Sequence, residues 1–162
     1  MSRSVFRNVS CLALLALAAP SMALGGESVL RSGTIGPVAV RCSIQNIYYY
    51  QGDFEFTYVI YDGVFVQIRG DRYRMRAPST DRHKANVDFR IQAWSADGRF
   101  KESEWVRSPD AMRQDNVWHA YHPVGDLRID FAPVKVNVQT LFTFDQQLTD
   151  HSCLANDDTV LE

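Results

Sequence analysis

The pattern that recurs along this sequence is an alternation of apolar and polar residues with a period of two. Five apolar positions alternate with four polar ones in residues 85–93, and the same pattern continues for eleven residues in 134–144. Because successive side chains of a strand point to opposite faces, such alternation predicts half-buried β-strands rather than helices. Shorter segments of this kind are residues 38–44, 54–60, 64–69, 73–77, 100–106, 117–121 and 127–131.

About eight to nine strands separated by turn residues predict an all-β domain, an antiparallel β-sandwich or barrel. One short helix is expected in residues 108–114, with Ser108 as its N-cap and Pro109 in its first turn. We expect weak order only at the ends of the exported chain, in residues 24–27 and 155–162.

One hairpin can be aligned from its apolar faces. A three-residue turn between residues 54–60 and 64–69 pairs Ile60 with Val64 and leaves Glu55 opposite Arg69. This register keeps the apolar side chains of both strands on one face, whereas a two-residue turn places them on opposite faces.

Residues 1–23 predict a cleavable secretory signal. Arg3 and Arg7 precede an apolar run at 11–19, and Ser21 and Ala23 are the small residues of a cleavage site. The run is shorter than the roughly 20 apolar residues that a membrane-spanning helix needs. We therefore expect residues 24–162 to form one exported β domain, in the bacterial periplasm or secreted, that does not span a membrane.

Two cysteines remain after cleavage, Cys42 and Cys153. An oxidising compartment predicts a disulfide between them. The bridge would close a loop for which chain entropy gives about 4 to 5 kcal/mol of stabilisation. A redox role is not expected, since no Cys-x-x-Cys spacing is present to lower a thiol pKa.

Basic residues gather between positions 69 and 84, although the formal net charge of the chain is −2. Three of them, Arg72, Arg74 and Arg76, alternate with other residues, so a strand would project all three from one face; we call them the arginine comb. The whole predicted anion-binding or partner-binding set is Arg69, Arg72, Arg74, Arg76, Arg82 and Lys84.

The arginine comb fits carboxylate or phosphate groups on a protein, an anionic glycan or a lipid head group. The alternative is a solvated strand face, or an edge strand that charge protects from aggregation. Nucleic acid is not an expected partner, because the domain lacks the net positive charge of nucleic-acid-binding proteins.

Aromatic residues form a second candidate surface. Trp94 falls on the polar side of its own strand, and neighbouring tyrosines at positions 48–50 must point to opposite faces. The predicted aromatic contact set is Tyr48, Tyr50, Trp94, Trp105 and Trp118. If these rings form an exposed patch, they mark a contact surface for a protein or a sugar. The alternative is that the rings are packed under loops and buried.

No catalytic motif is found: the sequence has no Gly-x-Ser-x-Gly elbow and no phosphate-binding glycine loop. His119 and His122 would point to opposite faces of a strand, so we expect neither a metal site nor a cofactor.

The leading hypothesis is a non-catalytic exported module that recognises a protein partner in the cell envelope, as an inhibitor or immunity protein does. A carbohydrate or anionic-polymer binding module that uses the tryptophans is the first alternative. The second is a small envelope hydrolase or metal-binding protein that uses His119, His122 and His151.

Overall fold

The computed structural model describes residues 29–44, 48–61, 65–78 and 82–160. Between residues 29 and 49 it describes only the backbone, apart from Ser32, and the same holds for residues 159 and 160. The predicted secretory signal lies outside the described residues. No helix in the described part of the chain is long and apolar enough to cross a membrane.

The described residues form nine strands and no helix. The strands are β1 (Val29–Ile44), β2 (Tyr48–Tyr61), β3 (Phe65–Arg76), β4 (Asn86–Ser95), β5 (Phe100–Glu102), β6 (His119–Ala120), β7 (Val124–Arg128), β8 (Pro133–Phe144) and β9 (His151–Val160). Three expected strands are shorter than predicted or displaced, since β5, β6 and β7 contain three, two and five residues.

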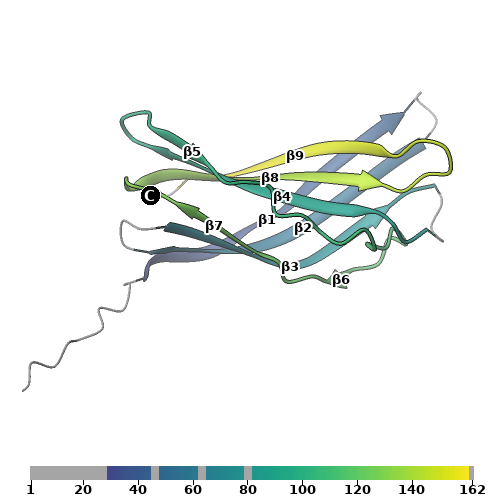
Figure 1. Ribbon diagram of the computed structural model, residues 1–162, viewed down its shortest axis with the longest axis horizontal. Helices are drawn as coiled ribbons and strands as arrows, with labels where there is room; N and C mark the ends of the chain where they lie inside the picture. Colours follow the sequence, from purple (N-terminus) through teal and green to yellow (C-terminus); the bar gives the residue numbers. More distant parts are fainter. Residues whose placement is uncertain (1–28, 45–47, 62–64, 79–81, 161–162) are drawn as a thin grey trace, which may run out of the picture.

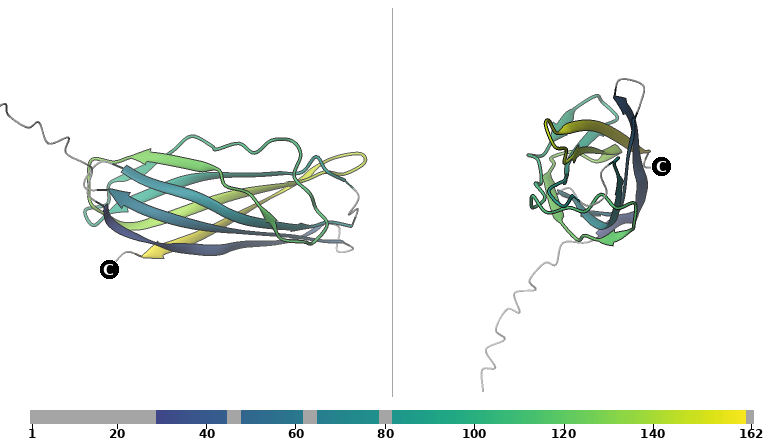
Figure 2. Two further views of the ribbon diagram at one scale, coloured as in Figure 1. Left: turned by 90° about the horizontal axis from the view of Figure 1, so that it is seen from below. Right: turned by 90° about the vertical axis from the view of Figure 1, so that its right-hand side faces the viewer.

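The strands make two antiparallel sheets that face each other as a sandwich (Figures 1 and 2). In the five-stranded sheet, β1, β2 and β3 follow in order, and β6 and β7 pair with different parts of β3. The four-stranded sheet has the order β5-β4-β8-β9. The two sheets also meet at their sides, where β1 contacts β9 and β4 contacts β7. The predicted all-β, sandwich-like fold is confirmed.

The inner faces of both sheets form one apolar core. The alternation predicted for residues 85–93 is confirmed, because all five of its apolar residues are fully buried. Phe89 of the four-stranded sheet meets Phe56 of the other sheet at 5.1 Å between ring centroids. Where a β-carbon on Gly52 would lie, the ring of Phe142 is found instead. The two sheets therefore approach closely at a position where one of them has no side chain.

The helix expected in residues 108–114 is not formed. The Ser108 hydroxyl accepts a hydrogen bond from the Val87 N–H at 2.9 Å, and the Ser108 N–H donates to Asp88 Oδ1 at 2.9 Å. Further along, Met112 pairs with Ala85 through two backbone hydrogen bonds. The capping serine thus binds a neighbouring strand, and the segment lies along the start of β4 instead of coiling.

The predicted hairpin register is wrong by two residues. Ile60 lies opposite Val66 rather than Val64, a shift that keeps every side chain on its predicted face. The rings of Tyr61 and Phe65 stack at 4.4 Å and extend the hairpin on both sides of its turn.

A bulge changes the pairing further along this hairpin. Between Glu55 and Phe56 the register moves by one residue, so Glu55 faces Arg72 instead of the predicted Arg69. Gly70 lies at this bulge because a β-carbon there would come within 2.7 Å of both Phe54 and Pro123.

The C-terminal segment is more ordered than expected. Residues 151–160 form β9, which pairs with β8 along its whole length, and Ala155 is buried in the core. Cys153 on this strand is disulfide-bonded. The side chain of Cys42, on the adjacent β1, lies outside the described set, so the pairing of these two cysteines stays a prediction.

Candidate functional site

The structure divides the predicted basic residues into paired and unpaired groups. Arg72 binds Glu55 through two hydrogen bonds of 2.7 and 3.0 Å, and this hydrogen bonding raises the pKa of Arg72. Arg74 binds Asp53 at 2.8 Å. Both carboxylates belong to β2, the strand next to the arginine comb, so most of the comb is neutralised within the protein.

The other four residues of the basic set have different surroundings. Arg82 pairs with Asp145 at 3.2 Å, at the start of the loop between β8 and β9. Arg69, Arg76 and Lys84 are exposed, and among the described side chains none of them has a carboxylate within ion-pair distance.

Trp118 brings the basic and aromatic features together. The guanidinium carbons of Arg72 and Arg74 lie 4.7 and 4.9 Å from the centre of its ring. The indole therefore covers two arginines that already have acidic partners, and these contacts hold the segment before β6 on the surface of β3.

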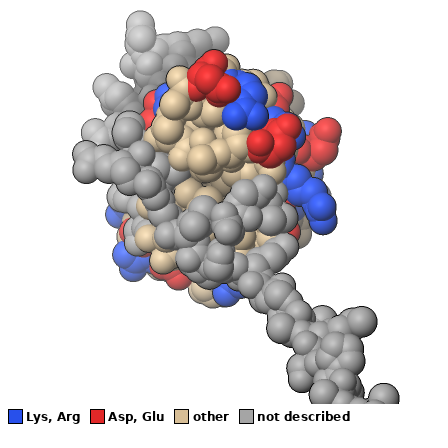
Figure 3. Space-filling view, turned by 90° about the vertical axis from the view of Figure 1, so that its left-hand side faces the viewer, with Lys and Arg blue, Asp and Glu red and all other residues tan. Residues whose placement is uncertain are grey.

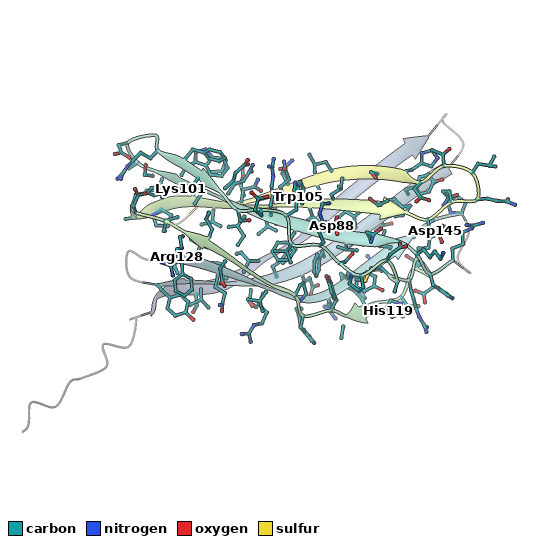
Figure 4. All side chains as sticks on the ribbon, viewed as in Figure 1. Asp88, Lys101, Trp105, His119, Arg128 and Asp145 are labelled. Carbon is teal, nitrogen blue, oxygen red and sulfur yellow. The ribbon has the colours of Figure 1, made fainter. Side chains whose placement is uncertain are left out.

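The other two tryptophans lie on the outer face of the four-stranded sheet. Trp94 contacts Phe100 at 5.0 Å and the Lys135 ammonium at 4.6 Å. Trp105 has Arg90 at 5.0 Å and Arg107 at 5.6 Å (Figure 4 labels Trp105). Each ring is half-buried and held by cationic side chains, which restricts its motion.

Between these tryptophans, six polar side chains from all four strands form a closed circuit of hydrogen bonds. We call this circuit the polar ring: Arg90, Gln92, Glu102, Asn137, Gln139 and Asn156.

Its bonds run from strand to strand. Glu102 accepts from Gln92 at 3.1 Å and pairs with Arg90 at 3.0 Å. Arg90 also donates to Gln139 at 2.7 Å. Asn137 completes the circuit by donating to Gln92 at 2.7 Å and to Asn156 at 3.2 Å, and Gln139 donates to Asn156 at 2.9 Å. The outer face thus carries an ordered network of polar side chains, of which Asn137 is buried, with an indole at each end.

Two predicted aromatic contacts are not part of this surface. Tyr50 is 3 % exposed and packs against Phe144 and His151, because position 50 faces inward on β2. Its assignment to an exposed patch is therefore wrong. The side chain of Tyr48 lies outside the described set.

The three histidines of the metal hypothesis have separate partners. His119 Nε2 lies 2.8 Å from Asp115, and His122 Nδ1 lies 3.3 Å from the carbonyl oxygen of Gly70. His151 lies in the other sheet, beside Tyr50. Within the described ranges, no three His, Cys, Asp or Glu side chains are grouped as metal ligands would be.

Asp115 links His119 to the turn that precedes β6. Burial alone would raise the pKa of its carboxyl, but hydrogen bonds from His119 and from the Val117 N–H outweigh burial and lower it. The carboxylate therefore remains ionised and holds the turn against β3.

The polar ring could not be found from the sequence, which shows its members only as the solvent side of their strands. A signal is present nonetheless in the polar positions of two alternating segments. One segment has Arg90 and Gln92 there and the other has Asn137 and Gln139, all of which can form hydrogen bonds to a neighbouring strand. Recognising it requires the knowledge that β4 pairs with β8.

Comparison with known proteins does not assign a family. No family model matches the sequence, and neither the curated proteins nor the solved structures contain a match. The function is therefore inferred from the surfaces described above.

Proposed function

We propose that this protein is a non-catalytic exported module that binds a protein partner through the outer face of its four-stranded sheet. The observation that supports it is the pair Trp94 and Trp105, each held against cations at either end of the polar ring. Tryptophan and arginine supply much of the binding energy at protein interfaces. Side chains that are already ordered lose less conformational entropy on binding.

The surroundings of the two tryptophans also suit a protein interface. Phe100 and Leu154, on the same face, are 46 % and 49 % exposed. Ion pairs lie at its edge, such as Lys135 with Asp158 at 2.7 Å. Aromatic and apolar groups surrounded by charged residues are the usual arrangement of such interfaces.

A neutral carbohydrate is the second candidate ligand, and the polar ring is the observation that favours it. Side-chain amides both donate and accept hydrogen bonds, as sugar hydroxyls do. An indole at the end of a row of amides could stack on a sugar ring.

Site-specific photo-crosslinking in cells of the source tests the protein-binding proposal. A crosslinking amino acid at position 154 lies on the proposed face, and one at exposed Thr57 lies on the outer face of the other sheet. We expect a single protein adduct from position 154 and none from position 57. The adduct should disappear when Trp94→Ala and Trp105→Ala are combined, and persist with Trp118→Ala.

Equal crosslinking from both positions would contradict the proposal. Binding of a glycan by the purified protein, lost in the same double variant, would instead assign this face to carbohydrate.

A further inference from the structure

At one end of the sandwich, backbone pairing between three segments brings several cationic residues close together. The segment 112–116 crosses there from one sheet to the other: Met112 bridges to Ala85 beside β4, and Asp115 bridges to Arg76 at the end of β3. Met112 and Gln114 point into the core, with exposed fractions of 5 % and 0 %. The residue between them, Arg113, therefore points outward.

Neighbouring backbone pairs place two more cations beside Arg113. Lys84 lies across from it, because the two residues flank the antiparallel bridge between Ala85 and Met112. Arg76 lies on the other side, directly opposite Asp115 and therefore diagonally across from Arg113. We call Arg76, Arg113 and Lys84 the basic row.

No described carboxylate lies within ion-pair distance of the basic row. The nearest candidate along the backbone, Asp115, is bound to His119 at 2.8 Å and to the Val117 N–H at 3.0 Å. Like charges on neighbouring positions destabilise a sheet, and a bound anion would remove that cost.

At the opposite end of the molecule, two cations have acidic partners. Arg99 pairs with Asp97 at 3.0 Å in the turn before β5, and Lys101 of β5 pairs at 3.1 Å with Asp130, which follows β7. Figure 3 shows positive and negative side chains intermixed on that end. Arg99 and Lys101 at that end are thus neutralised within the protein, whereas Arg128 at the same end (Figure 4) has no described carboxylate within ion-pair distance.

The same end carries an exposed leucine on an anchored loop. The loop 145–150 extends beyond the other elements (Figures 1 and 2), and Leu148 within it is 95 % exposed. Buried Gln114 holds the base of the loop, because its amide donates to the Asp145 carbonyl oxygen at 2.9 Å and accepts from the Asp145 N–H at 3.1 Å. Arg82 pairs with the Asp145 side chain as well.

We propose that this end of the sandwich binds an anionic lipid surface. Leu148 enters the boundary between head groups and acyl chains, and the basic row contacts lipid phosphates. Peripheral proteins combine an apolar insertion with basic residues in this way. A small soluble anion would be bound by the cations alone and would make no use of Leu148. The site lies at the end of the molecule, so it does not compete with a partner on the outer sheet face.

Vesicle co-sedimentation of residues 24–162 tests the proposal. We expect binding to vesicles of phosphatidylglycerol and phosphatidylcholine in equal amounts, little binding to pure phosphatidylcholine, and a decline with added salt. Replacing Arg113 or Lys84 with alanine should weaken binding about fivefold each, the effect of one cation near an anionic membrane. Leu148→Ser should weaken it about tenfold or more, as expected for a buried leucine side chain.

Two matched variants serve as controls. Arg69→Ala removes an exposed, unpaired arginine from the middle of the hairpin, and Leu154→Ser removes an exposed leucine from the sheet face. Both should bind vesicles as the parent protein does.

Three outcomes would overturn the proposal: no binding to anionic vesicles, binding that Leu148→Ser leaves unchanged, or full displacement by inorganic phosphate at constant ionic strength. The second would show that cations alone bind the head groups, and the third that the basic row holds a soluble anion. None of them bears on crosslinking from position 154, so the two proposals fail separately.

Discussion

Replacing Gly52 with alanine should destabilise the protein, because the new methyl group would overlap the ring of Phe142. A β-carbon at position 52 would lie 2.5 Å from Cγ and 2.6 Å from Cε1 of that ring. Both residues are buried, and they belong to facing sheets. Overpacking a core typically lowers the free energy of unfolding by about 1 to 3 kcal/mol. We expect about 3 kcal/mol here, since a rigid ring rather than a flexible chain must move.

A double-mutant cycle separates this overlap from other effects of the substitution. Phe142→Ala alone should cost about 4 kcal/mol, the usual range for a buried phenylalanine. The double variant should also cost about 4 kcal/mol, because the alanine methyl then fills part of the cavity, giving a coupling of about 3 kcal/mol.

Urea unfolding followed by tryptophan fluorescence measures these differences. Gly98→Ala is the control: open space surrounds Gly98, so only its positive φ of 85° should matter, at about 1 kcal/mol. A cost below about 0.5 kcal/mol for Gly52→Ala, or additive costs in the cycle, would refute the close packing of β2 on β8.

Further predictions concern charge, pH and processing. Arg74→Glu should lower the free energy of unfolding by about 2 kcal/mol, because it leaves the buried Asp53 carboxylate facing a like charge, whereas Arg69→Glu should change it by less than about 0.5 kcal/mol. Burial raises the pKa of Tyr121 to about 12. Since an unfolded tyrosine ionises near pH 10, stability should fall between pH 10 and 12, and Tyr121→Phe should reduce that fall in pH-dependent urea titrations. Intact mass should show a product that begins at Leu24 and has no free thiol, and elemental analysis should find no stoichiometric zinc or copper.

The sequence predicted which side chains are buried better than it predicted which strands meet. Alternation is a local property, so the buried face of residues 85–93 followed directly from the order of residues. Pairing is not local. In the observed hairpin Tyr61 stacks on Phe65 and a bulge lies at Gly70, and neither feature leaves a periodic signal in the sequence. The helix at 108–114 failed because Ser108 found a partner on β4.

The candidate surfaces show the same limit. Arg72 and Arg74 were correctly placed on one strand, but the acids that neutralise them lie on a neighbouring strand whose register was predicted wrongly. Arg113 was missed because it fell in the predicted helix, although its alternation between Met112 and Gln114 is that of an extended segment. Trp94 was expected to be a contact residue, yet its cation, Lys135, comes from a strand about forty residues further along the chain.

The contact between β1 and β9 also bears on how this protein comes to be folded. The first and last strands lie side by side, so the sandwich can close only after the C-terminal segment is available. In a partly synthesised chain that lacks β8 and β9, the four-stranded sheet is incomplete and β4 has only the short β5 beside it. Folding dominated by such distant contacts is slow compared with helical proteins. We therefore expect the inner face of the first sheet to stay uncovered until β8 and β9 have been made, and the chain to be exposed to aggregation during that time.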